Sequence, residues 1–540
     1  MKLKSLTKLL AGVLMSATFL TACSGDASGD TTSPTQSGGG ADVTATASDK
    51  SNEKVVVASY YFPTVLEPSK DWESWYIVEF GVGETLTRYS QTGEVLPWLA
   101  ESWQISEDND CIWEIKLRED VNFSNGAAMT ATKVKESMER LYSMEDPANG
   151  GNGNPHAHFD FTEIVADDEN FTIYLETTVP TPDLPGALAY PWQLIVDAEA
   201  TAEMDTYTQC VVGTGPYIFT SFEPGISLTG VASENYWNGT PGFKEIEVVK
   251  MEDSNMRAMA LIEGSIDFTV NLDPSGLEAL KGHDNVTVEE YAGTKTEMDH
   301  MNLTGVLGND TLRQAIVMSV DGDLIADNVL NGLYGWGFAL IPSGLDFGYD
   351  QLTNTFPHDL DKALALLDSA GIVDTDGDGI RELDGENISL KYVSKTGQIE
   401  VEARIEMIKK LGFEINHVMI DDYLPLLYAR DFDLIASHDT ATPTGDPAKF
   451  LSRWYSLNVD NNFSGFSNPE YDALYEALIV EFDADVRREL CIEMQQLLID
   501  HAVCIIGGYP EYNACYVTGL QGTNVGAYYY YQITPELQYG

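Results

Sequence analysis

A run of alternating aspartates has the composition of a calcium-binding loop. Asp374, Asp376 and Asp378 stand at positions 1, 3 and 5 of such a loop, and a glycine stands at position 6. Position 12 is a glycine instead of the usual glutamate, and Glu382 and Asp384 are the nearest substitutes. Because partial motifs are common without a metal, we expect either calcium held by these five carboxylates or a polar turn.

Two histidines, His156 and His158, follow a Gly/Asn-rich stretch at residues 149–155. Imidazole is a good ligand for nickel, copper and zinc. The pair therefore predicts either a contact to a transition metal or an ordinary surface loop, and the shortness of the motif favours the loop.

Catalytic signatures are missing from the sequence. It contains no GxSxG, HExxH or Walker loop. With 85 aspartates and glutamates, carboxylate pairs will arise by chance and do not indicate a glycosidase. We therefore expect no enzyme, with an exported hydrolase as the weaker alternative.

The N-terminus has the features of an export signal. Three lysines precede an apolar run at residues 9–20, which is shorter than the roughly 20 residues that cross a bilayer. The run ends in Leu-Thr-Ala before Cys23, which resembles a bacterial lipobox. This predicts a signal peptide at 1–22 and a tether at 23–53 that is lipidated on Cys23. The tether is expected to be disordered because it has no aromatic residue and no large apolar side chain except Val43.

The composition limits the class of partner. Thirty lysines and arginines against 85 acidic residues give a net charge of −55, which should repel a phosphate backbone, so no nucleic-acid partner is expected. The chain has 44% hydrophobic residues, so residues 54–540, which follow the signal peptide and the tether, have enough apolar surface for several globular domains. Five cysteines follow Cys23, and they predict either buried free thiols or a disulfide such as Cys504–Cys515.

Strand and helix patterns alternate along the body. Period-two or short apolar runs predict strands at residues 55–58, 112–117, 171–175 and 414–418. Amphipathic runs predict helices at 130–142, 359–370, 401–411 and 470–499, with a break near Asp483. Interleaved strands and helices indicate a mixed α/β fold.

Several short motifs occur in the order of one known family. The most specific is Gly-Thr-Gly-Pro-Tyr at residues 213–217, a backbone motif in which glycine and proline set unusual turns. The other matching segments are residues 84–88, 96–103, 113–118, 121–126, 130–134, 235–239, 257–267, 301–302, 312–321 and 446–447. The chain therefore resembles the peptide/nickel-type (family 5) extracytoplasmic solute-binding proteins of ABC importers.

The resemblance implies an α/β, bilobed, periplasmic-binding-protein-like fold of type II, in the large peptide-binder class. Lobe I would consist of 54–85, 212–292 and 505–540, with a subdomain inserted at 86–211, and lobe II would be 293–504. The ligand cleft would lie between the lobes and close by a hinge.

The resemblance also implies site residues. In peptide-binding members an aspartate just before the late Asp-Pro dipeptide binds the ligand amine, but this chain has Pro443 there. Asp439 is the substitute that we expect, beside His438 and Asp446, and His438 stands where tryptophan is usual. Lys395 lies where some members bind the ligand carboxylate, and a solvated loop lysine is an equally good interpretation.

The function implied is the capture of short peptides and their delivery to the permease subunits of an ABC importer. The protein would be a monomer, exported and held on the outer face of the cytoplasmic membrane by lipid on Cys23. No cofactor is required by this function, apart from calcium if the loop binds it. The alternative within the family is a binding protein for nickel or another metal as a chelate.

Overall fold

The computed structural model describes residues 51–70, 72–144, 155–205 and 209–540. The expected signal peptide, the Cys23 lipidation site and nearly all of the expected tether lie outside the described residues. Residues from Asp49 to Gly540 form one compact unit.

A twelve-stranded sheet organises the described residues. Its main order is β18-β17-β19-β13-β20-β11-β1-β10-β9-β8, and β12 and β14 also pair with β20. The strands are β1 (Lys54–Ser59), β8 (Tyr217–Glu223), β9 (Ser227–Ala232), β10 (Glu245–Lys250), β11 (Phe268–Val270), β12 (Val286–Ala292), β13 (Lys295–Met301), β14 (Tyr334–Gly335), β17 (Ser389–Ser394), β18 (Glu414–Met419), β19 (Leu434–Thr440) and β20 (Cys504–Val517).

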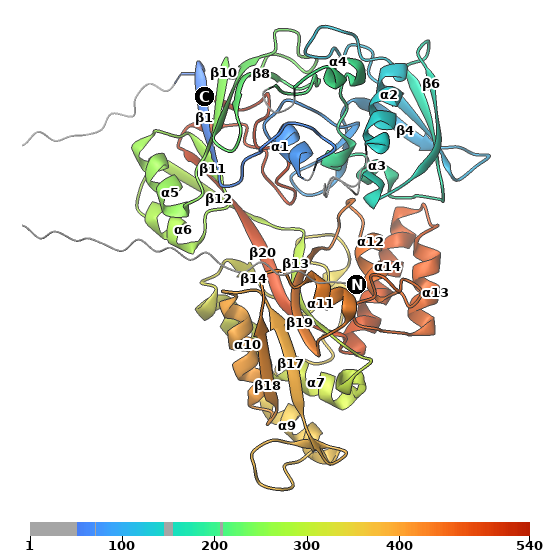
Figure 1. The fold of residues 1–540 in the computed structure, drawn as a ribbon, viewed down its shortest axis with the longest axis vertical. Coiled ribbons are helices and arrows are strands. Elements are labelled where there is room, and N and C mark those ends of the chain that lie inside the picture. The colour runs from blue at the N-terminus through green and yellow to red at the C-terminus, as the bar shows by residue number, and fades with distance from the viewer. Residues whose placement is uncertain (1–50, 71, 145–154, 206–208) are drawn as a thin grey trace, which may run out of the picture. The chain divides into compact units, whose positions relative to one another are not determined.

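The long strand β20 joins the two ends of this sheet. Its first residues pair with β13, and its last residues pair with β11 and β12. In Figure 1, β20 runs as one red strand from the region of β13 and β19 to that of β11 and β12. A single strand is therefore shared by two groups of elements that each have their own hydrophobic core.

A separate antiparallel sheet has the order β4-β5-β7-β6, formed by β4 (Ala100–Ile105), β5 (Ile112–Leu117), β6 (Phe161–Asp167) and β7 (Thr172–Thr177). Helix α2 (Ala131–Ser143) covers it (Figure 1). Val134 and Met138 of α2 lie in one core with Ile115 of β5, because the period of a helix and that of a strand both direct their apolar side chains inward. Two-stranded pairs complete the strands: β2 (Thr87–Tyr89) with β3 (Val95–Pro97), β15 (Glu382–Leu383) with β16 (Glu386–Asn387), and β21 (Leu520–Gln521) with β22 (Gln538–Tyr539).

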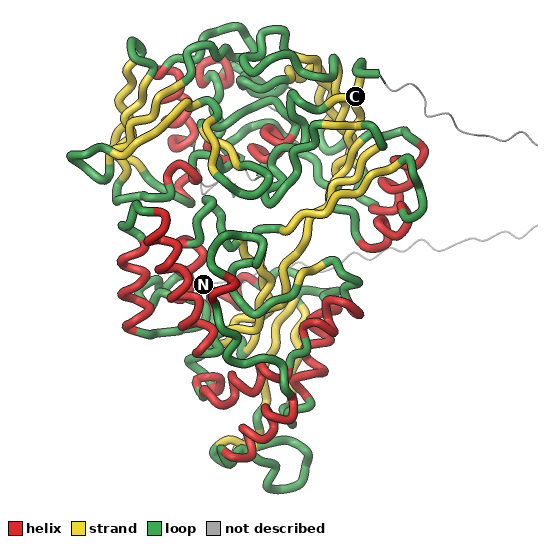
Figure 2. Tube along the Cα trace, turned by 180° about the vertical axis from the view of Figure 1, so that it is seen from behind, coloured by secondary structure: helices red, strands yellow, loops and turns green. Residues whose placement is uncertain are grey.

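Helices flank the strands of the β17–β19 end of the large sheet (Figure 2). Besides α2, the helices are α1 (Glu73–Glu79), α3 (Leu184–Ala187), α4 (Ala198–Ala202), α5 (Ser254–Glu263), α6 (Pro274–Leu280), α7 (Asp310–Ser319), α8 (Gly322–Leu324), α9 (Leu360–Ser369), α10 (Ile399–Lys409), α11 (Leu424–Ala429), α12 (Ala448–Leu451), α13 (Pro469–Leu478) and α14 (Ala484–Asp500).

The strands and helices that the sequence predicts are confirmed, with boundaries shifted by one or two residues at most ends. The predicted break near Asp483 separates α13 from α14, because the Asp483 side chain accepts hydrogen bonds from Asp485 N and Val486 N and so caps α14. Thr130 caps α2 and Asp359 caps α9 in the same way.

Glu84 connects several of the motifs that carry the family resemblance. This buried carboxylate accepts hydrogen bonds from Trp98 Nε1 at 2.9 Å, Thr214 Oγ1 at 2.8 Å, Tyr236 OH at 2.6 Å and Trp237 Nε1 at 3.0 Å. Burial raises the pKa of Glu84, and the four donors act in the opposite direction. The Pro-Trp, Gly-Thr-Gly-Pro-Tyr and Tyr-Trp motifs therefore meet at one polar centre of the fold.

The disulfide alternative for Cys504 and Cys515 is wrong. Both cysteines lie on β20 and have free thiols. The other cysteines of the described residues are also free. At a rise of ~3.3 Å per residue, eleven positions on one strand separate them far beyond the ~7 Å that a disulfide allows between Cα atoms.

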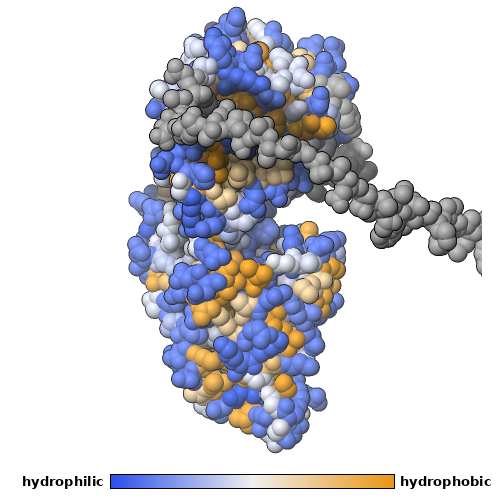
Figure 3. All heavy atoms as spheres, turned by 90° about the vertical axis from the view of Figure 1, so that its left-hand side faces the viewer, coloured by the Kyte–Doolittle hydropathy of each residue, from blue (hydrophilic) through white to orange (hydrophobic). Residues whose placement is uncertain are grey.

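In the described residues, none of the helices combines the length and apolar character needed to cross a membrane. The face drawn in Figure 3 is mostly hydrophilic, with apolar residues in smaller groups. This surface is in keeping with the large excess of acidic residues in the sequence.

Candidate functional site

A cavity of about 690 Å³ brings together five segments that are distant in the sequence. It is lined by residues of 59–79, 157–192, 294–295, 438–453 and 512–532. The volume lies in the range of small-molecule sites, which are typically ~300–1,000 Å³.

Aromatic side chains form most of the cavity wall. Among the described residues, eleven tyrosines and tryptophans line it. Trp72 stacks on Trp192 with ring centroids 5.6 Å apart, and Trp75 packs edge-on against the same ring at 5.0 Å. Trp72 and Tyr61 nevertheless remain 49% and 62% exposed, so their faces are available to an apolar or planar group of a ligand.

The end of β19 and the short helix after it supply one group of charges. Asp439 is the second-last residue of β19, and its Oδ2 atom accepts a hydrogen bond from Arg453 Nε in an ion pair. Lys449 and Arg453 lie four residues apart on α12 and the 3₁₀ turn that continues it (Ser452–Trp454). Both cations line the cavity, as Asp439 does.

Strand register places a third cation in the same cavity. Lys295 begins β13 and pairs with Thr440 of β19, one position from Asp439. Its ammonium group lies 6.0 Å from the centroid of the Tyr529 ring and forms no ion pair with any described carboxylate. Burial lowers the pKa of Lys295, and Glu297 and Asp439 act in the opposite direction.

Glu79, at the end of α1, is a buried carboxyl group in the wall. Gln532 Nε2 donates to Glu79 Oε2 at 2.9 Å. Burial raises the pKa of Glu79 well above its usual range. A carboxyl group that keeps its proton adds a polar contact to the cavity without adding a negative charge.

His158 is a half-buried histidine whose two ring nitrogens are both buried. Its ring packs against Tyr190 with centroids 4.2 Å apart, and neither Nδ1 nor Nε2 has a hydrogen-bond partner among the described residues. Burial, with a smaller effect of the Lys449 charge, lowers its pKa to about 3. The neutral imidazole therefore offers the cavity one unused donor and one unused acceptor or metal-ligating nitrogen.

The four predicted ligand-binding residues separate into two pairs. His438 and Asp439 line the cavity. Asp446 instead binds Arg487, with Oδ1–Nη2 at 2.7 Å and Oδ2–Nε at 2.9 Å, and does not line it. Lys395 is exposed outside the cavity lining, with Nζ 5.5 Å from the centroid of the Tyr423 ring.

The predicted histidine pair also divides. His156 is hydrogen-bonded through Nδ1 to Asp160 Oδ1 and packs against Tyr142 at 4.5 Å, whereas His158 lines the cavity. Spacing alone could not separate them, because a short 3₁₀ turn (Pro155–Ala157) ends between the two residues.

Sequence reasoning missed three cations and the buried Glu79. Lys449 and Arg453 had a usable signal, because two cations four residues apart follow the Asp-Pro dipeptide in a chain with only 30 lysines and arginines. Lys295 lies just after the expected lobe boundary at 292, where the chain would cross the cleft. Glu79 had no signal in a chain so rich in acids.

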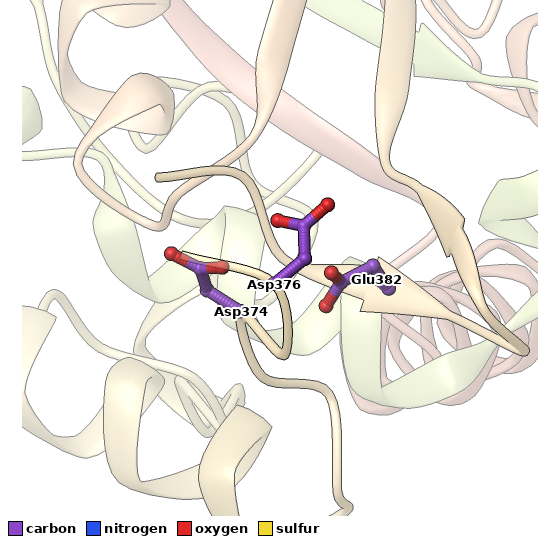
Figure 4. A group of neighbouring side chains, drawn as sticks. All are labelled: Asp374, Asp376 and Glu382. Atoms are coloured by element: carbon purple, nitrogen blue, oxygen red, sulfur yellow. The ribbon is translucent and has the colours of Figure 1, made fainter. Parts of the chain in front are cut away.

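The predicted calcium loop is an acidic turn between α9 and β15. Ligand oxygens of Asp374, Asp376 and Glu382 lie within 4.8 Å of one another (Figure 4). Glu382 also accepts hydrogen bonds from the backbone and hydroxyl of Thr375. Asp378 accepts from Asn387 Nδ2 at 2.8 Å.

Asp384 has a left-handed backbone, with φ at 54°, in the turn between β15 and β16. Calcium binding stays a prediction of the sequence.

A second cavity, of about 530 Å³, is lined by both polar and apolar groups, and its aromatic lining residues include Trp336 and Phe338. Its polar groups include Asp321 and His358, which face each other at 3.8 Å. It offers no unpaired lysine or arginine, so the charged aromatic cavity is the better candidate for a polar solute.

The relatives of this chain are solute-binding proteins. It is 24% identical over 425 residues to the nickel-binding protein NikA of Staphylococcus aureus, covering 78% of this chain and 81% of that protein. It is 26% identical over 465 residues to the probable D,D-dipeptide-binding periplasmic protein DdpA of Escherichia coli, covering 82% and 85%.

Solved structures agree with this relationship. The crystal structure of a nickel ABC transporter from Bacillus halodurans aligns with a TM-score of 0.76 and 26% identity, over 90% of this chain and 99% of that one. The expected type II, periplasmic-binding-protein-like α/β fold is confirmed. The profile of the bacterial extracellular solute-binding proteins, family 5 Middle, matches residues 94–462, and the chain belongs to this family.

Proposed function

We propose that this protein captures short peptides in the charged aromatic cavity and delivers them to the permease of an ABC importer. A peptide in solution carries an ammonium group and a carboxylate, and both must find partners when they leave water. The observation that supports this most is that one carboxylate, Asp439, lies in the same cavity as two cations, Lys295 and Lys449, that form no ion pair with any described residue.

The proposed arrangement gives each ligand terminus a partner. Asp439 binds the ligand amine, in exchange for part of its contact with Arg453, and a lysine binds the ligand carboxylate. The aromatic walls hold the side chains by apolar contact, which tolerates different residues and suits a peptide transporter.

Titration calorimetry with a dipeptide and its end-blocked forms tests this function. We expect Ala-Ala to bind and both N-acetyl-Ala-Ala and Ala-Ala-amide to bind at least tenfold more weakly, because charge-assisted hydrogen bonds contribute ~1.5–3 kcal/mol. Equal affinity of free and blocked peptides would contradict the proposal.

A metal chelate is the second candidate, and His158 is the observation that favours it. Its two ring nitrogens are buried at the cavity and have no hydrogen-bond partner among the described residues. One of them could therefore coordinate a metal such as nickel. The relatives that are named as nickel proteins also favour a metal chelate as the ligand. The cations of the cavity would then bind the carboxylates of the chelator.

The location that we propose is the outer face of the cytoplasmic membrane, through lipid on Cys23. The test is fractionation of cells that express the wild type or Cys23→Ala. The wild type should stay with membranes and the variant should be released or remain unprocessed. An unchanged membrane fraction for a processed variant would contradict lipid anchoring.

A further inference from the structure

The candidate cavity is positively charged in a strongly acidic protein. Its lining contains Lys295, Lys449 and Arg453, and its one carboxylate with an ion-pair partner is Asp439, bound to Arg453. The whole chain has a net charge of −55. Three cations in one cavity are therefore a local reversal of the charge of the molecule.

Other carboxyl groups near the cavity act on Lys295 and Lys449 at a distance, but none of the described ones forms an ion pair with either lysine. Burial raises the pKa of Glu79 and so favours its neutral form. Glu297 accepts a hydrogen bond from Tyr334 at 2.8 Å, and Asp183 accepts one from Thr444 at 2.7 Å. Neither Glu297 nor Asp183 lines the cavity. Lys295 and Lys449 are thus left without a carboxylate partner among the described residues.

We infer that the ligand of this site carries two carboxylates, one for Lys295 and one for Lys449. The inference rests on the proposed solute-binding function and narrows its ligand class. A neutral dipeptide has one carboxylate and would leave one of the lysines unpaired in the closed complex, at a cost in desolvation.

Two kinds of solute have this chemistry. A peptide with a glutamate or aspartate side chain has two carboxylates and one amine, and the amine matches Asp439. A metal chelate of a polycarboxylate such as citrate has two or more carboxylates and no ammonium group, and its metal could be bound by His158. Both fit a cavity of about 690 Å³ with aromatic walls.

Dipeptides that differ only in charge test the inference. Affinities of the chain from Asp49 to Gly540 are measured by titration calorimetry for Ala-Glu against Ala-Gln, Glu-Ala against Gln-Ala, and nickel citrate against nickel alone. We expect an acidic dipeptide to bind at least fivefold more tightly than its amide, or nickel citrate to bind at least fivefold more tightly than nickel.

Substitutions locate the effect. Lys449→Gln and Lys295→Gln each remove one partner of a ligand carboxylate. Each should therefore reduce the ratio of affinities, acidic dipeptide over its amide or nickel citrate over nickel, to less than twofold. Lys281→Gln is the matched control, because Lys281 is an exposed lysine on the surface, paired with Glu278, and should change nothing. The unfolding midpoint of each variant shows whether it is folded.

The outcomes are distinct. A preference for acidic dipeptides supports both the inference and the peptide proposal, and a preference for nickel citrate alone supports the inference and contradicts the peptide proposal. Neutral dipeptides that bind as well as acidic ones overturn the inference and leave the peptide proposal standing. Binding of no ligand overturns both.

Discussion

Asp439 forms an ion pair with Arg453 at the wall of the aromatic cavity, and both side chains are about three-quarters buried. The carboxylate expected to bind a ligand amine is therefore held in position by a cation. A partner that can rotate away lets Asp439 change from an internal contact to a ligand contact.

Asp439→Asn should weaken the binding of peptides with a free amine by about 10- to 100-fold, because it removes a charged acceptor for the ammonium group. N-acetylated peptides should change by less than threefold. Titration calorimetry measures both. Asp431→Asn is the control, since Asp431 is an exposed carboxylate that pairs with Lys391 on the surface. An equal loss for free and acetylated peptides would contradict a role for Asp439 at the amine.

The metal interpretation makes a separate prediction for His158. His158→Phe fills the same space without ring nitrogens, so the affinity for a nickel chelate should fall at least tenfold while peptide affinity changes little. His156→Gln is the control, because His156 pairs with Asp160 and does not line the cavity. Unchanged chelate affinity in the His158 variant would remove the structural reason for a metal.

Glu84→Ala should lower the free energy of unfolding by about 3–5 kcal/mol. The substitution leaves the Trp98, Thr214, Tyr236 and Trp237 donors without their acceptor, and unsatisfied buried donors cost ~1–3 kcal/mol each before relaxation. Urea unfolding measures the change. Glu94→Ala, at an exposed position of the same region, should stay within about 0.5 kcal/mol. A loss below 1 kcal/mol for Glu84→Ala would show that these contacts are replaceable.

The burial of His300 predicts that the free energy of unfolding of the protein falls in weak acid. It is buried against Trp454 and Phe463, and burial, helped by the Arg453 charge, lowers its pKa to about 3. Between pH 6.5 and 3 the unfolded chain binds a proton at this residue and the folded protein does not. Its contribution to stability is therefore complete above pH 6.5 and is lost as the pH falls.

The comparison of wild type with His300→Phe isolates this effect, because groups present in both proteins cancel. The stability of the wild type relative to the variant should fall by about 2 kcal/mol between pH 7 and pH 5. Parallel pH profiles would contradict the prediction, because they would show that His300 binds its proton equally in the folded and unfolded states.

The sequence predicted the elements more completely than the site. Strand β5 and helix α2 follow from local periodicity, and the break at Asp483 follows from a capping side chain. Asp446 shows the limit of a motif, because its position in the Asp-Pro dipeptide does not reveal that both its oxygens bind Arg487. The cavity joins five distant segments through the pairing of β13, β19 and β20, and such long-range register cannot be derived from one sequence.

Thermal unfolding of the chain from Asp49 to Gly540 tests the central claim, that the aromatic cavity binds the solute, most directly. It is measured with acidic, neutral and longer peptides and with nickel chelates, for the wild type and for Lys295→Gln/Lys449→Gln. At 100 times Kd, a ligand of the folded state adds ~2.7 kcal/mol. We predict a raised midpoint for the wild type with an acidic dipeptide, and at least half of that increase should be lost in the double variant. An equal increase in both proteins would place the solute elsewhere, and no increase with any ligand would contradict the claim.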